Sequence, residues 1–587
     1  MIVPMKKVAV IVLSKEADSA VKRLRSLGVL HVEHQQAPKG KDIAALHDDI
    51  ELANSSVLIL SSQETKKGMP RSPAKEASDW KLTARHIIDL QKRMEQLDEY
   101  SATLRHRIEQ WDEWGDFDPE LIKSLAVKNI HIRLYQIPIS EINNLPSGVI
   151  VKKLFIAGGL AGCVIISRGE ADVPFKEIPL PKTGLREMKA RLAEDLKVMH
   201  NISEEIKKSV SYQGALIRAK KGLEKELEFN EALKGMGQAG QIAYIVGYAP
   251  ADETDKVIQA AKQNRWGIFV RDPSEEDAVP TLIRNPRWAS LMEPVFRLME
   301  IVPGYRELDI SPLFLLFLSL FFGMIIGDAG YGFLYIALTA IAHKRLGNRL
   351  KDAKIFFLLY LFSSSAVLWG VLTGTVFGQE WYINAGMRPL LPVLNNTRFL
   401  QAFCFFLGAF HLTLGQGWQA IRKFPSLAAL SDIGWISILW AAFFVARMLI
   451  LSYPLPPAAK WLIIGGVILV IFFTNPSKNI LKTIGTGLGA FALSIMNNFT
   501  DVVSYVRLFA VGLAGVAISD TVNTLAASMG GNSLPTQLVI LFLGHTINVV
   551  LGPISVLVHG VRLNVLEFSG HAGLSWSGRA YKPLKDT

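Results

Sequence analysis

The pattern of apolar and polar positions divides the chain near residue 300. Residues 1–300 mix charged and apolar positions over short distances, whereas residues 312–568 are mostly apolar. A helix needs about 20 apolar residues to cross a bilayer, and the second part holds several such stretches. We therefore expect a cytoplasmic α+β domain over residues 1–300, followed by an all-α polytopic membrane domain over residues 301–587.

In the first part, strand-like alternation changes to helical spacing and back. A strand is expected over residues 7–13, a helix over 16–27 and a second strand over 29–33. Similar alternating stretches recur later in this part. The economical arrangement is two α/β lobes, one near residues 1–70 plus 235–275 and the other near residues 118–180.

Two long helices are expected to join these lobes. Apolar residues repeat at steps of three and four over residues 84–112 and again over residues 183–233, as in a coiled coil. We expect the two helices to pair antiparallel, either as a scaffold or as a docking surface for a partner. The contacting positions would be Ile87, Leu90, Met94, Leu97, Leu104, Ile108 and Trp111 on the first helix, and Leu185, Met188, Leu192, Met199, Ile202 and Ile206 on the second.

The apolar part divides into eight predicted helical segments. Residues 312–343 are too long for one span, and the central GDAGYG (Gly327 to Gly332) suits a turn between two short helices. The last two segments exceed about 30 residues, so they should tilt or protrude from the bilayer. After the first two, the segments are expected at 354–376, 399–421, 433–452, 459–475, 484–528 and 534–568.

Basic residues collect in alternate connections between these segments. The connections at 343–354, 422–423 and 475–483 carry Lys and Arg, whereas the opposite connections carry few. Cytoplasmic loops of membrane proteins are enriched in these residues. The pattern predicts that both termini are cytoplasmic, as an even number of spans requires.

Two arginines, Arg507 and Arg562, lie inside the last two apolar segments. A guanidinium at bilayer depth costs roughly 2.5 to 3.5 kcal/mol, and it keeps its proton because its pKa stays above about 12. Each arginine continues a polar stripe at helical spacing, which needs shelter from lipid. We expect an ion path along these stripes. The alternative is that their side chains hold helices together by hydrogen bonds.

The stripes supply the candidate site residues. Asp501 lies one step off the first stripe, where it would line the path or pair with Arg507, and Glu567 lies near the predicted cytoplasmic end, where reaching water is cheap. Asp328 is either a turn residue or functional. The path candidates are Asn497, Thr500, Asp501, Ser504, His545, Asn548, Ser555, His559 and Glu567; small residues Ala510, Ala514 and Ala517 follow Arg507; the turn holds Gly327, Asp328, Gly330 and Gly332.

Composition excludes several other kinds of chemistry. The net charge of +11 is accounted for by basic cytoplasmic loops and does not call for a nucleic-acid partner. With only Cys163 and Cys404, no disulfide framework or CxxC metal site can form. The sequence holds no GxxxxGK[ST] or HExxH pattern, and no GxGxxG pattern that follows a predicted strand. We therefore expect no cofactor, no metal and no nucleotide site, and we interpret the first residues as a strand rather than a signal peptide.

Four stretches resemble the large membrane subunit of rotary V-type and A-type ATPases, called subunit I in prokaryotes and subunit a in eukaryotes. They are PTLIRNPRWASLMEPVFRLMEIVPGYRELDISP, FFGMIIGDAGYGFL, SYVRLFAVGLAG and VHGVRLNVLEF. The resemblance implies a non-catalytic stator subunit in a prokaryotic cell membrane. It also implies a rotating proteolipid (c/K-type) ring, peripheral stalk (E/G-type) subunits and the remaining ATPase subunits as partners.

The resemblance further implies roles for particular residues. Arg507 matches the arginine held against the ring carboxylates, with Arg562 assisting it and Ala510, Ala514 and Ala517 allowing the ring to approach. The polar candidates would then line two half-channels. Gly515 and Gly552 stand where eukaryotic members often carry His and Glu, so half-channel details do not transfer from those members.

Two other classes of protein remain open from the residues alone. One is a secondary ion transporter or channel with a cytoplasmic regulatory domain, which inverted repeats would favour; none is visible in the sequence. The other is an adaptor whose membrane part only anchors it, which the buried arginines argue against. The choice between proton and sodium, and between ATP synthesis and hydrolysis, is left open.

Overall fold

A computed structural model describes residues 1–64, 79–146, 148–169, 173–347, 352–379, 390–476, 479–529 and 534–586. Residues 65–70 of the first predicted lobe lie outside this range, as do parts of the basic connections at 343–354 and 475–483. The chain divides into two compact units. One contains Met1–Ile11, Leu27–Glu33 and Val246–Lys585, and the other contains mainly Val12–Ser26 and His34–Ile245. This division differs from the expected boundary near residue 300, which stays a prediction.

A small sheet brings early and late parts of the soluble sequence together. Its strand order is β2 (His31–Glu33), β8 (Ile242–Pro250), β1 (Met5–Leu13) and β9 (Gly267–Arg271), and β7 (Gly237–Ala239) also pairs with β8. Strand β1 runs antiparallel to β9, and β2 runs antiparallel to β8. The alternate residues Val8, Val10 and Val12 of β1 are buried, because successive side chains of a strand point to opposite faces. Helix α1 (Ala17–Leu27) lies between β1 and β2 in the sequence, and helix α7 (Thr254–Gln263) lies between β8 and β9.

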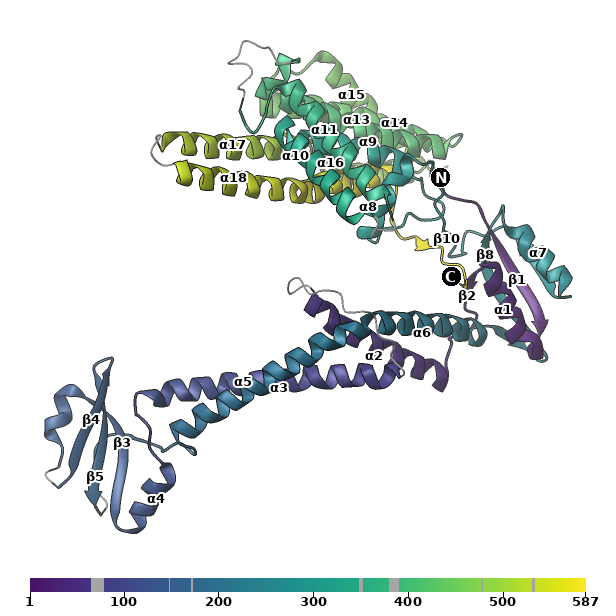
Figure 1. The fold of residues 1–587 in the computed structure, drawn as a ribbon. Helices are drawn as coiled ribbons and strands as arrows, with labels where there is room; N and C mark the ends of the chain where they lie inside the picture. Colours follow the sequence, from purple (N-terminus) through teal and green to yellow (C-terminus); the bar gives the residue numbers. More distant parts are fainter. Residues whose placement is uncertain are drawn as a thin grey trace. The chain divides into compact units, whose positions relative to one another are not determined.

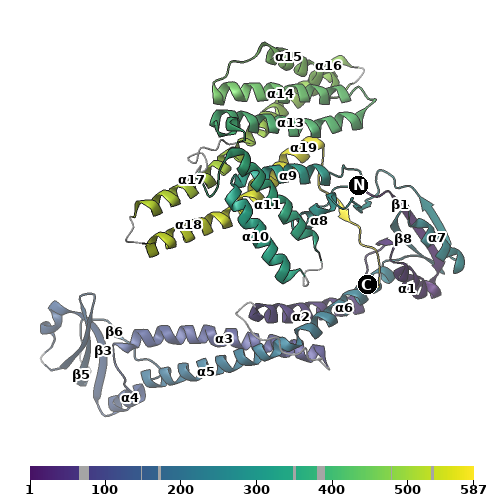
Figure 2. The same ribbon diagram turned by 45° about the horizontal axis from the view of Figure 1, so that its top comes forward.

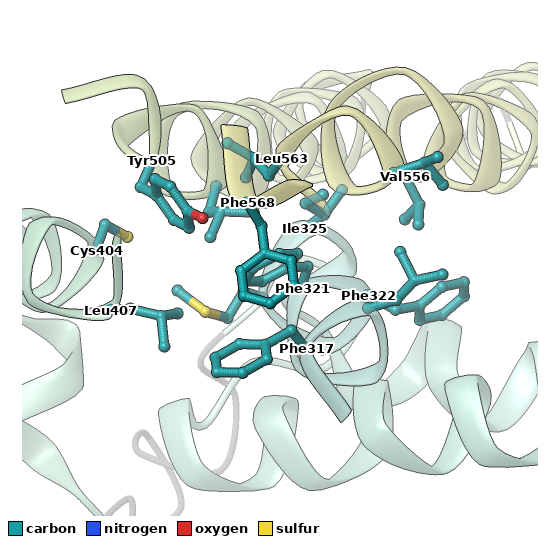
Figure 3. Packing of buried hydrophobic residues seen from close by; sticks show 14 of the residues in the cluster. Phe317, Phe321, Phe322, Ile325, Cys404, Leu407, Tyr505, Val556, Leu563 and Phe568 are labelled. Carbon is teal, nitrogen blue, oxygen red and sulfur yellow. The ribbon is translucent and has the colours of Figure 1, made fainter. Parts of the chain in front are cut away.

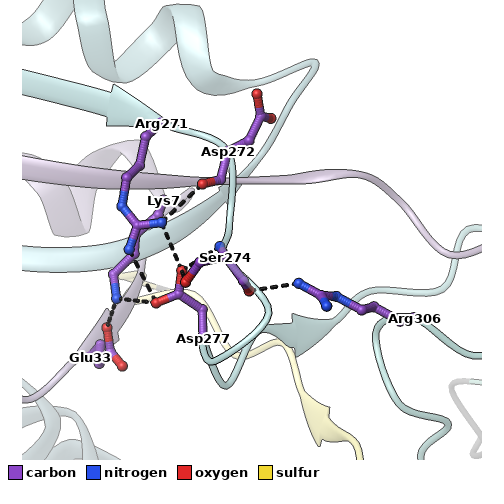
Figure 4. Close-up of polar contacts among 7 residues, drawn as sticks. All are labelled: Lys7, Glu33, Arg271, Asp272, Ser274, Asp277 and Arg306. Atoms are coloured by element: carbon purple, nitrogen blue, oxygen red, sulfur yellow. Dashed lines mark hydrogen bonds and ion pairs between the residues drawn. The ribbon is translucent and has the colours of Figure 1, made fainter.

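An ion-pair network ties this sheet to the loop after β9 (Figure 4). The carboxylate of Asp277 accepts from Lys7 Nζ at 2.8 Å and from the Ser274 backbone N–H at 2.7 Å, and Arg271 Nη1 lies 2.9 Å from it. Lys7 Nζ also lies 3.0 Å from Glu33. Burial opposes ionisation, but these hydrogen bonds keep the pKa of Asp277 well below its usual range and that of Lys7 above its own.

A strand near the C-terminal end returns to the same region. Strand β11 (Arg579–Ala580) pairs in parallel with β10 (Pro280–Thr281). Beyond it, Tyr581 donates its hydroxyl to the Val29 carbonyl, and the Leu584 backbone N–H donates to the Leu30 carbonyl at 2.9 Å. The segment after the membrane helices is therefore hydrogen-bonded to the strand region at the start of the chain.

The second unit is built around a helix bundle. Helices α3 (Trp80–Asp112) and α5 (Leu185–Ser209) lie side by side (Figure 1). They run antiparallel, because His86 pairs with Glu205 and Lys189 pairs with Asp112. Ile87, Leu104, Met188, Ile202 and Ile206, all at expected coiled-coil positions, are buried.

The bundle is larger than the expected helix pair. The second helical run is interrupted at Val210–Tyr212, after which α6 (Gln213–Lys234) begins. Helix α2 (Lys41–Glu64), which the sequence analysis does not identify, packs against α6 and α3. Leu60 of α2 and Leu216 of α6 join the buried cluster around Ile87 and Ile206. At the far end of α3 and α5, helix α4 (Pro119–Val127) contacts a sheet of order β4 (Ile150–Ala157), β5 (Leu160–Arg168), β3 (Ile130–Pro138), β6 (Glu177–Ile178).

The apolar region is helical throughout its described length. After α8 (Glu293–Leu298) come α9 (Ser311–Ile326), α10 (Ala329–Leu346), α11 (Lys354–Thr373), α13 (Thr397–Lys423), α14 (Ala429–Leu451), α15 (Pro457–Phe473), α16 (Ile480–Ser504), α17 (Val506–Ser528) and α18 (Leu534–Ser555). Two π-helical turns, Val556–Gly560 and Leu563–Phe568, lead into α19 (Ser569–Ala572). Helices α13, α14 and α15 form a row of neighbours (Figure 2).

The described residues contain five to six membrane-spanning candidates, so the expected eight are not confirmed. Five helices are long and apolar enough: α11, α13, α14, the joined α16–α17 and the joined α18–α19. Helices α9 and α10 count as a sixth only if the pair, bent by 119°, is one span. Helix α15 has 17 residues and falls short of the length required. Counting apolar residues cannot separate a bent span from two spans.

One apolar core holds these helices together. Phe317 and Phe321 of α9, Leu407 of α13, Tyr505 and Phe568 point into it (Figure 3). The core therefore packs the helix bearing Arg507 against α9 and α13.

We expect the Asp277 network to make the β1–β9 pairing sensitive to acid. Its folded-state pKa lies below the unfolded value of about 3.9, so its stabilisation is complete above that pH and is lost as the pH falls through the folded pKa. Asp277→Asn should remove about 1 to 3 kcal/mol at pH 7. Amide hydrogen exchange of β1 and β9 at pH 7 and pH 3 measures this. The variant should exchange faster at pH 7 and respond less to acid; an unchanged difference between the two pH values would contradict the assignment.

Candidate ion-translocation site

Arg507 lies at the start of α17, directly after the junction with α16. The preceding Tyr505 is fully buried, and its hydroxyl lies 2.8 Å from His411 Nδ1 on α13. The His411 ring is stacked between Phe317 and Phe568, with ring centroids 3.7 Å and 4.3 Å away. This packing holds the α16–α17 junction in place, and with it the backbone that carries the Arg507 side chain.

Glu567 neutralises part of the arginine charge. Arg507 Nη2 donates to Glu567 Oε1 at 2.6 Å, and Arg507 Nε donates to the Ser504 carbonyl at 3.0 Å. Arg562 Nε lies 3.6 Å from the same carboxylate oxygen. Glu567 is 6% exposed, against 22% for Arg507 and 55% for Arg562. Two permanent positive charges therefore share one buried carboxylate, and the cluster keeps a net positive charge.

The π-helical turns account for the contact between Arg562 and Glu567, the two charged residues of the α18 continuation. A π-turn widens the helix to an i→i+5 pattern, and such turns are frequent at functional sites. Arg562 separates the turn Val556–Gly560 from the turn Leu563–Phe568, which carries Glu567. The sequence pattern, which assumes an ordinary α-helix, cannot reveal this local change.

The stripe on α16 and α17 faces outward from the chain. Asn497, Thr500, Ala510, Ala514 and Ala517 are exposed, while Ser504 and Arg507 are partly buried. An exposed face of α17 that carries small residues therefore continues beyond the arginine. Asp501 takes a different partner from the one considered in the sequence: its Oδ2 lies 3.1 Å from His571 Nε2, whereas Arg507 pairs with Glu567.

The candidates on α18 fall into a second polar cluster. His545 Nδ1 lies 2.6 Å from the Tyr331 hydroxyl, and His545 Nε2 lies 3.1 Å from Asn523 Oδ1. Asn548 Nδ2 donates to Ser519 Oγ at 2.7 Å. These contacts join α10, α17 and α18 by hydrogen bonds, as the alternative interpretation of the stripes expects.

A cavity of about 110 Å³ lies beside the second cluster, between α10, α17 and α18. It is wide enough for water, which needs roughly 10 to 15 Å³ by this measure. Its lining includes Tyr331, Ala514, Asn548, Gly552 and Ser555. His559, the remaining candidate on this stretch, is partly buried one turn beyond Ser555.

The GDAGYG stretch forms the sharp break between α9 and α10. Gly327 ends α9 with φ of +65°, a backbone conformation that side chains disfavour. The buried carboxylate of Asp328 accepts from the Tyr331 backbone N–H at 3.0 Å and from the backbone N–H groups of Phe377 and Gly378 at 2.9 and 2.7 Å. Asp328 thus caps α10 and fixes the loop after α11.

The two remaining glycines of the stretch allow close packing. A Cβ on Gly332 would lie 2.6 Å from the backbone nitrogen of Val367 on α11, and one on Gly330 would lie 2.7 Å from the Phe377 ring. Gly327, Asp328, Gly330 and Gly332 thus form the turn and its close packing, and Tyr331 contacts His545 on α18.

The sequence pattern does not single out several polar residues that contact the candidate site. Tyr331, Ser519 and Asn523 contact the α18 candidates, and His411, Gln416 and Asp432 lie on α13 and α14. The available signal was their position as isolated polar residues within apolar segments. Their partners lie far away in the sequence, so no spacing rule connects them.

Comparison with known proteins identifies the family. No protein-family model matches the chain. V-type ATP synthase subunit I 1 of Treponema pallidum is 31% identical over 624 residues, covering 100% of both chains. V-type ATP synthase subunit I of Borreliella burgdorferi is 31% identical over 618 residues, covering 100% of this chain and 99% of that protein. A-type ATP synthase subunit I of Methanocaldococcus jannaschii is 25% identical over 452 residues, covering 66% and 63%.

These relatives, together with the apolar helices, define the class: the chain is a membrane subunit of a rotary ATPase and works with other subunits of that assembly. It is an integral membrane protein and is not an enzyme by itself. More narrowly, the chain belongs to the subunit I family of V-type and A-type ATP synthases.

We expect Asp328 to be essential for the α9–α10 break. Asp328→Asn keeps the size of the side chain but turns an amide N–H toward backbone N–H donors. Leaving buried donors unpaired costs about 1 to 3 kcal/mol. The thermal unfolding midpoint of the detergent-solubilised assembly should fall, whereas Asp520→Asn, at an exposed position of α17, should leave it unchanged. Equal midpoints for both variants would contradict this role.

Proposed function

We propose that this chain is the stator subunit that forms the ion half-channels against a rotating proteolipid ring. The observation that carries the proposal is the shared carboxylate at the arginines. Glu567 bonds to one edge of the Arg507 guanidinium, and in the part of the chain that the structure describes Nη1 of Arg507 has no partner. A guanidinium has five N–H donors, so donors remain for a second carboxylate.

The mechanism follows from permanent charge. An ionised ring carboxylate that reaches Arg507 is stabilised in its charged form, because a nearby positive charge lowers the pKa of a carboxyl group. The site must then give up its ion before it passes the arginine. Since Arg507 never loses its proton, it also blocks a direct leak between the half-channels. The small residues Ala510, Ala514 and Ala517 give the ring helices room to approach.

The polar clusters on either side of Arg507 would line the half-channels. On one side lie Asn497, Thr500, Asp501, Ser504 and Glu567, and on the other lie His545, Asn548, Ser555 and His559. The cavity beside Asn548 and Ser555 supports access of water on the second side. One charge that crosses 100 mV involves about 2.3 kcal/mol, which is the energy that rotation would exchange with the ion gradient.

The soluble part would hold the subunit still. We propose that the paired helices α3 and α5 act as a strut, and that the α/β lobes dock the peripheral stalk (E/G-type) subunits. The chain would be a multi-pass protein of a prokaryotic cell membrane with both termini cytoplasmic, as the basic connections indicate.

We expect Arg507→Lys to abolish coupled ion pumping. A lysine ammonium is a compact charge without the planar fork that serves two carboxylates. ATP-driven ion uptake into vesicles that contain the assembled complex should fall at least about a hundredfold, equivalent to about 2.7 kcal/mol. Subunit composition after purification should be unchanged.

Lys482→Arg, on the exposed start of α16, supplies the control with a similarly small change in a basic side chain. Normal pumping by Arg507→Lys would overturn the proposed role of Arg507. A chain that never co-purifies with a proteolipid ring would overturn the stator function.

A further inference from the structure

A second line of polar side chains lies beside Arg507, on the side of α13 and α14. His571 Nε2 lies 3.1 Å from Asp501 Oδ2, and His571 Nδ1 lies 3.3 Å from Gln416 Oε1. Gln416 Nε2 donates to Asp432 Oδ1 at 2.9 Å. Lys423 Nζ donates to the same Asp432 oxygen at 2.9 Å. The line joins four elements: α16, α19, α13 and α14.

The order of donors and acceptors in this line is fixed by its Asp432 end. Asp432 Oδ1 accepts hydrogen bonds from both Lys423 Nζ and Gln416 Nε2. Gln416 must therefore turn its NH₂ group toward Asp432 and its carbonyl oxygen toward His571. That oxygen also only accepts, so Nδ1 of His571 must carry a hydrogen.

The consequence falls on the other ring nitrogen. With Nδ1 protonated, Nε2 of His571 and Oδ2 of Asp501 face each other as two basic atoms when no further proton is present. One added proton fits between them, either on Nε2 or on Oδ2. The pair is thus built to hold one exchangeable proton, and Gln416 keeps the imidazole in the required tautomer.

Asp501 is the more accessible member of the pair and lies on the side of Arg507. Its side chain is 28% exposed, whereas that of His571 is 9% exposed. Toward Arg507, Ser504 Oγ donates to the Asp501 carbonyl at 2.8 Å and lies 3.4 Å from Glu567 Oε1. Asp501 lies six residues before Arg507, about 9 Å along the helix axis.

We propose that Asp501 and His571 form a proton-relay site in the half-channel beside Arg507. Gln416 and Asp432 are positioning residues. The inference rests on the proposed stator function. The proton on Nε2 of His571 moves to Oδ2 of Asp501, which leaves a neutral imidazole with Nδ1–H still bonded to Gln416. It then passes to the ring carboxylate, or in the reverse direction when the motor runs backward.

The surrounding charges suit transfer of a proton. The titratable and charged groups near the pair are His411 on α13, Asp432 and Lys423 at the Gln416 end, and Glu567 and Arg507 beyond Ser504. Nε2 of His571 and Oδ2 of Asp501 lie 3.1 Å apart, close enough to hand over a proton.

The test uses the assembled complex in vesicles and measures ATP-driven proton uptake with a pH-sensitive dye. His571→Ala should lower uptake at least tenfold, with ATPase subunits and ring still co-purifying. Added imidazole should restore part of the uptake, because a soluble base replaces the missing proton carrier; a purely structural loss would not respond. Asn498→Ala, which removes a buried polar side chain of α16 outside the relay, should pump normally with and without imidazole.

Two further variants separate relay from folding. Asp501→Asn keeps the shape but cannot take the proton, and should also lose at least tenfold if His571→Ala fails to assemble. Gln416→Leu should raise the solvent deuterium isotope effect on uptake, as expected when a poorly held imidazole slows proton transfer.

The outcomes also distinguish this inference from the stator function. If Arg507→Lys blocks uptake while Asp501→Asn or His571→Ala pumps normally, the relay is overturned and the stator function stands. Loss without rescue by imidazole, or undiminished sodium uptake by these variants, likewise overturns the relay. Normal pumping by Arg507→Lys overturns the proposed function itself.

Discussion

The membrane part of this subunit is organised around one requirement: a guanidinium that never loses its proton must be satisfied within apolar surroundings. Removing one partner of a buried ion pair typically costs 3 to 5 kcal/mol, because a charge is left uncompensated. Glu567 meets this requirement for Arg507 at 2.6 Å. Because the carboxylate comes from the continuation of α18 and the guanidinium from α17, the pair also fixes the register of these two helices.

The same requirement explains why the surroundings of the arginine are rigid on one side and open on the other. His411, Tyr505, Phe317 and Phe568 pack tightly behind the helix junction. On the outward face, the short side chains of Ala510, Ala514 and Ala517 are exposed. The Arg507 guanidinium is therefore held by a tightly packed helix junction and adjoins a face of exposed alanines.

Periodicity predicted the parts of the fold that depend on one helix at a time. The positions of Ile87 and Ile206 in the coiled-coil pattern agree with their burial between α3 and α5. Helix α2 was missed because its buried residues Leu46, Ala53 and Leu60 are seven apart, and other apolar residues lie between them, so no single helical stripe stands out. The GDAGYG stretch predicted the break between α9 and α10, which is present as a 119° bend, but the number of spans that this pair contributes depends on tertiary packing rather than on apolar length.

The candidate site divides in the same way. Arg507 and Arg562 could be found by sequence because a charge in an apolar segment is conspicuous in itself. Their relation to Glu567 could not, because it depends on π-helical turns and on contact between residues 60 positions apart. Gln416, Asp432 and His571 are further examples. Each of them is an isolated polar residue in the sequence, and only the fold brings them into one hydrogen-bonded line.

The pairing of β11 with β10 has a consequence for the order of events during synthesis. Residues 280–281 leave the ribosome about three hundred residues before their partners at 579–580, and the whole helical region is made in between. Chain elongation at about 5 to 20 residues per second leaves that edge unpaired for at least roughly fifteen seconds. The contacts of Tyr581 and Leu584 with Val29 and Leu30 close only afterwards. The sheet region can therefore reach its final form only after the whole helical region has been synthesised.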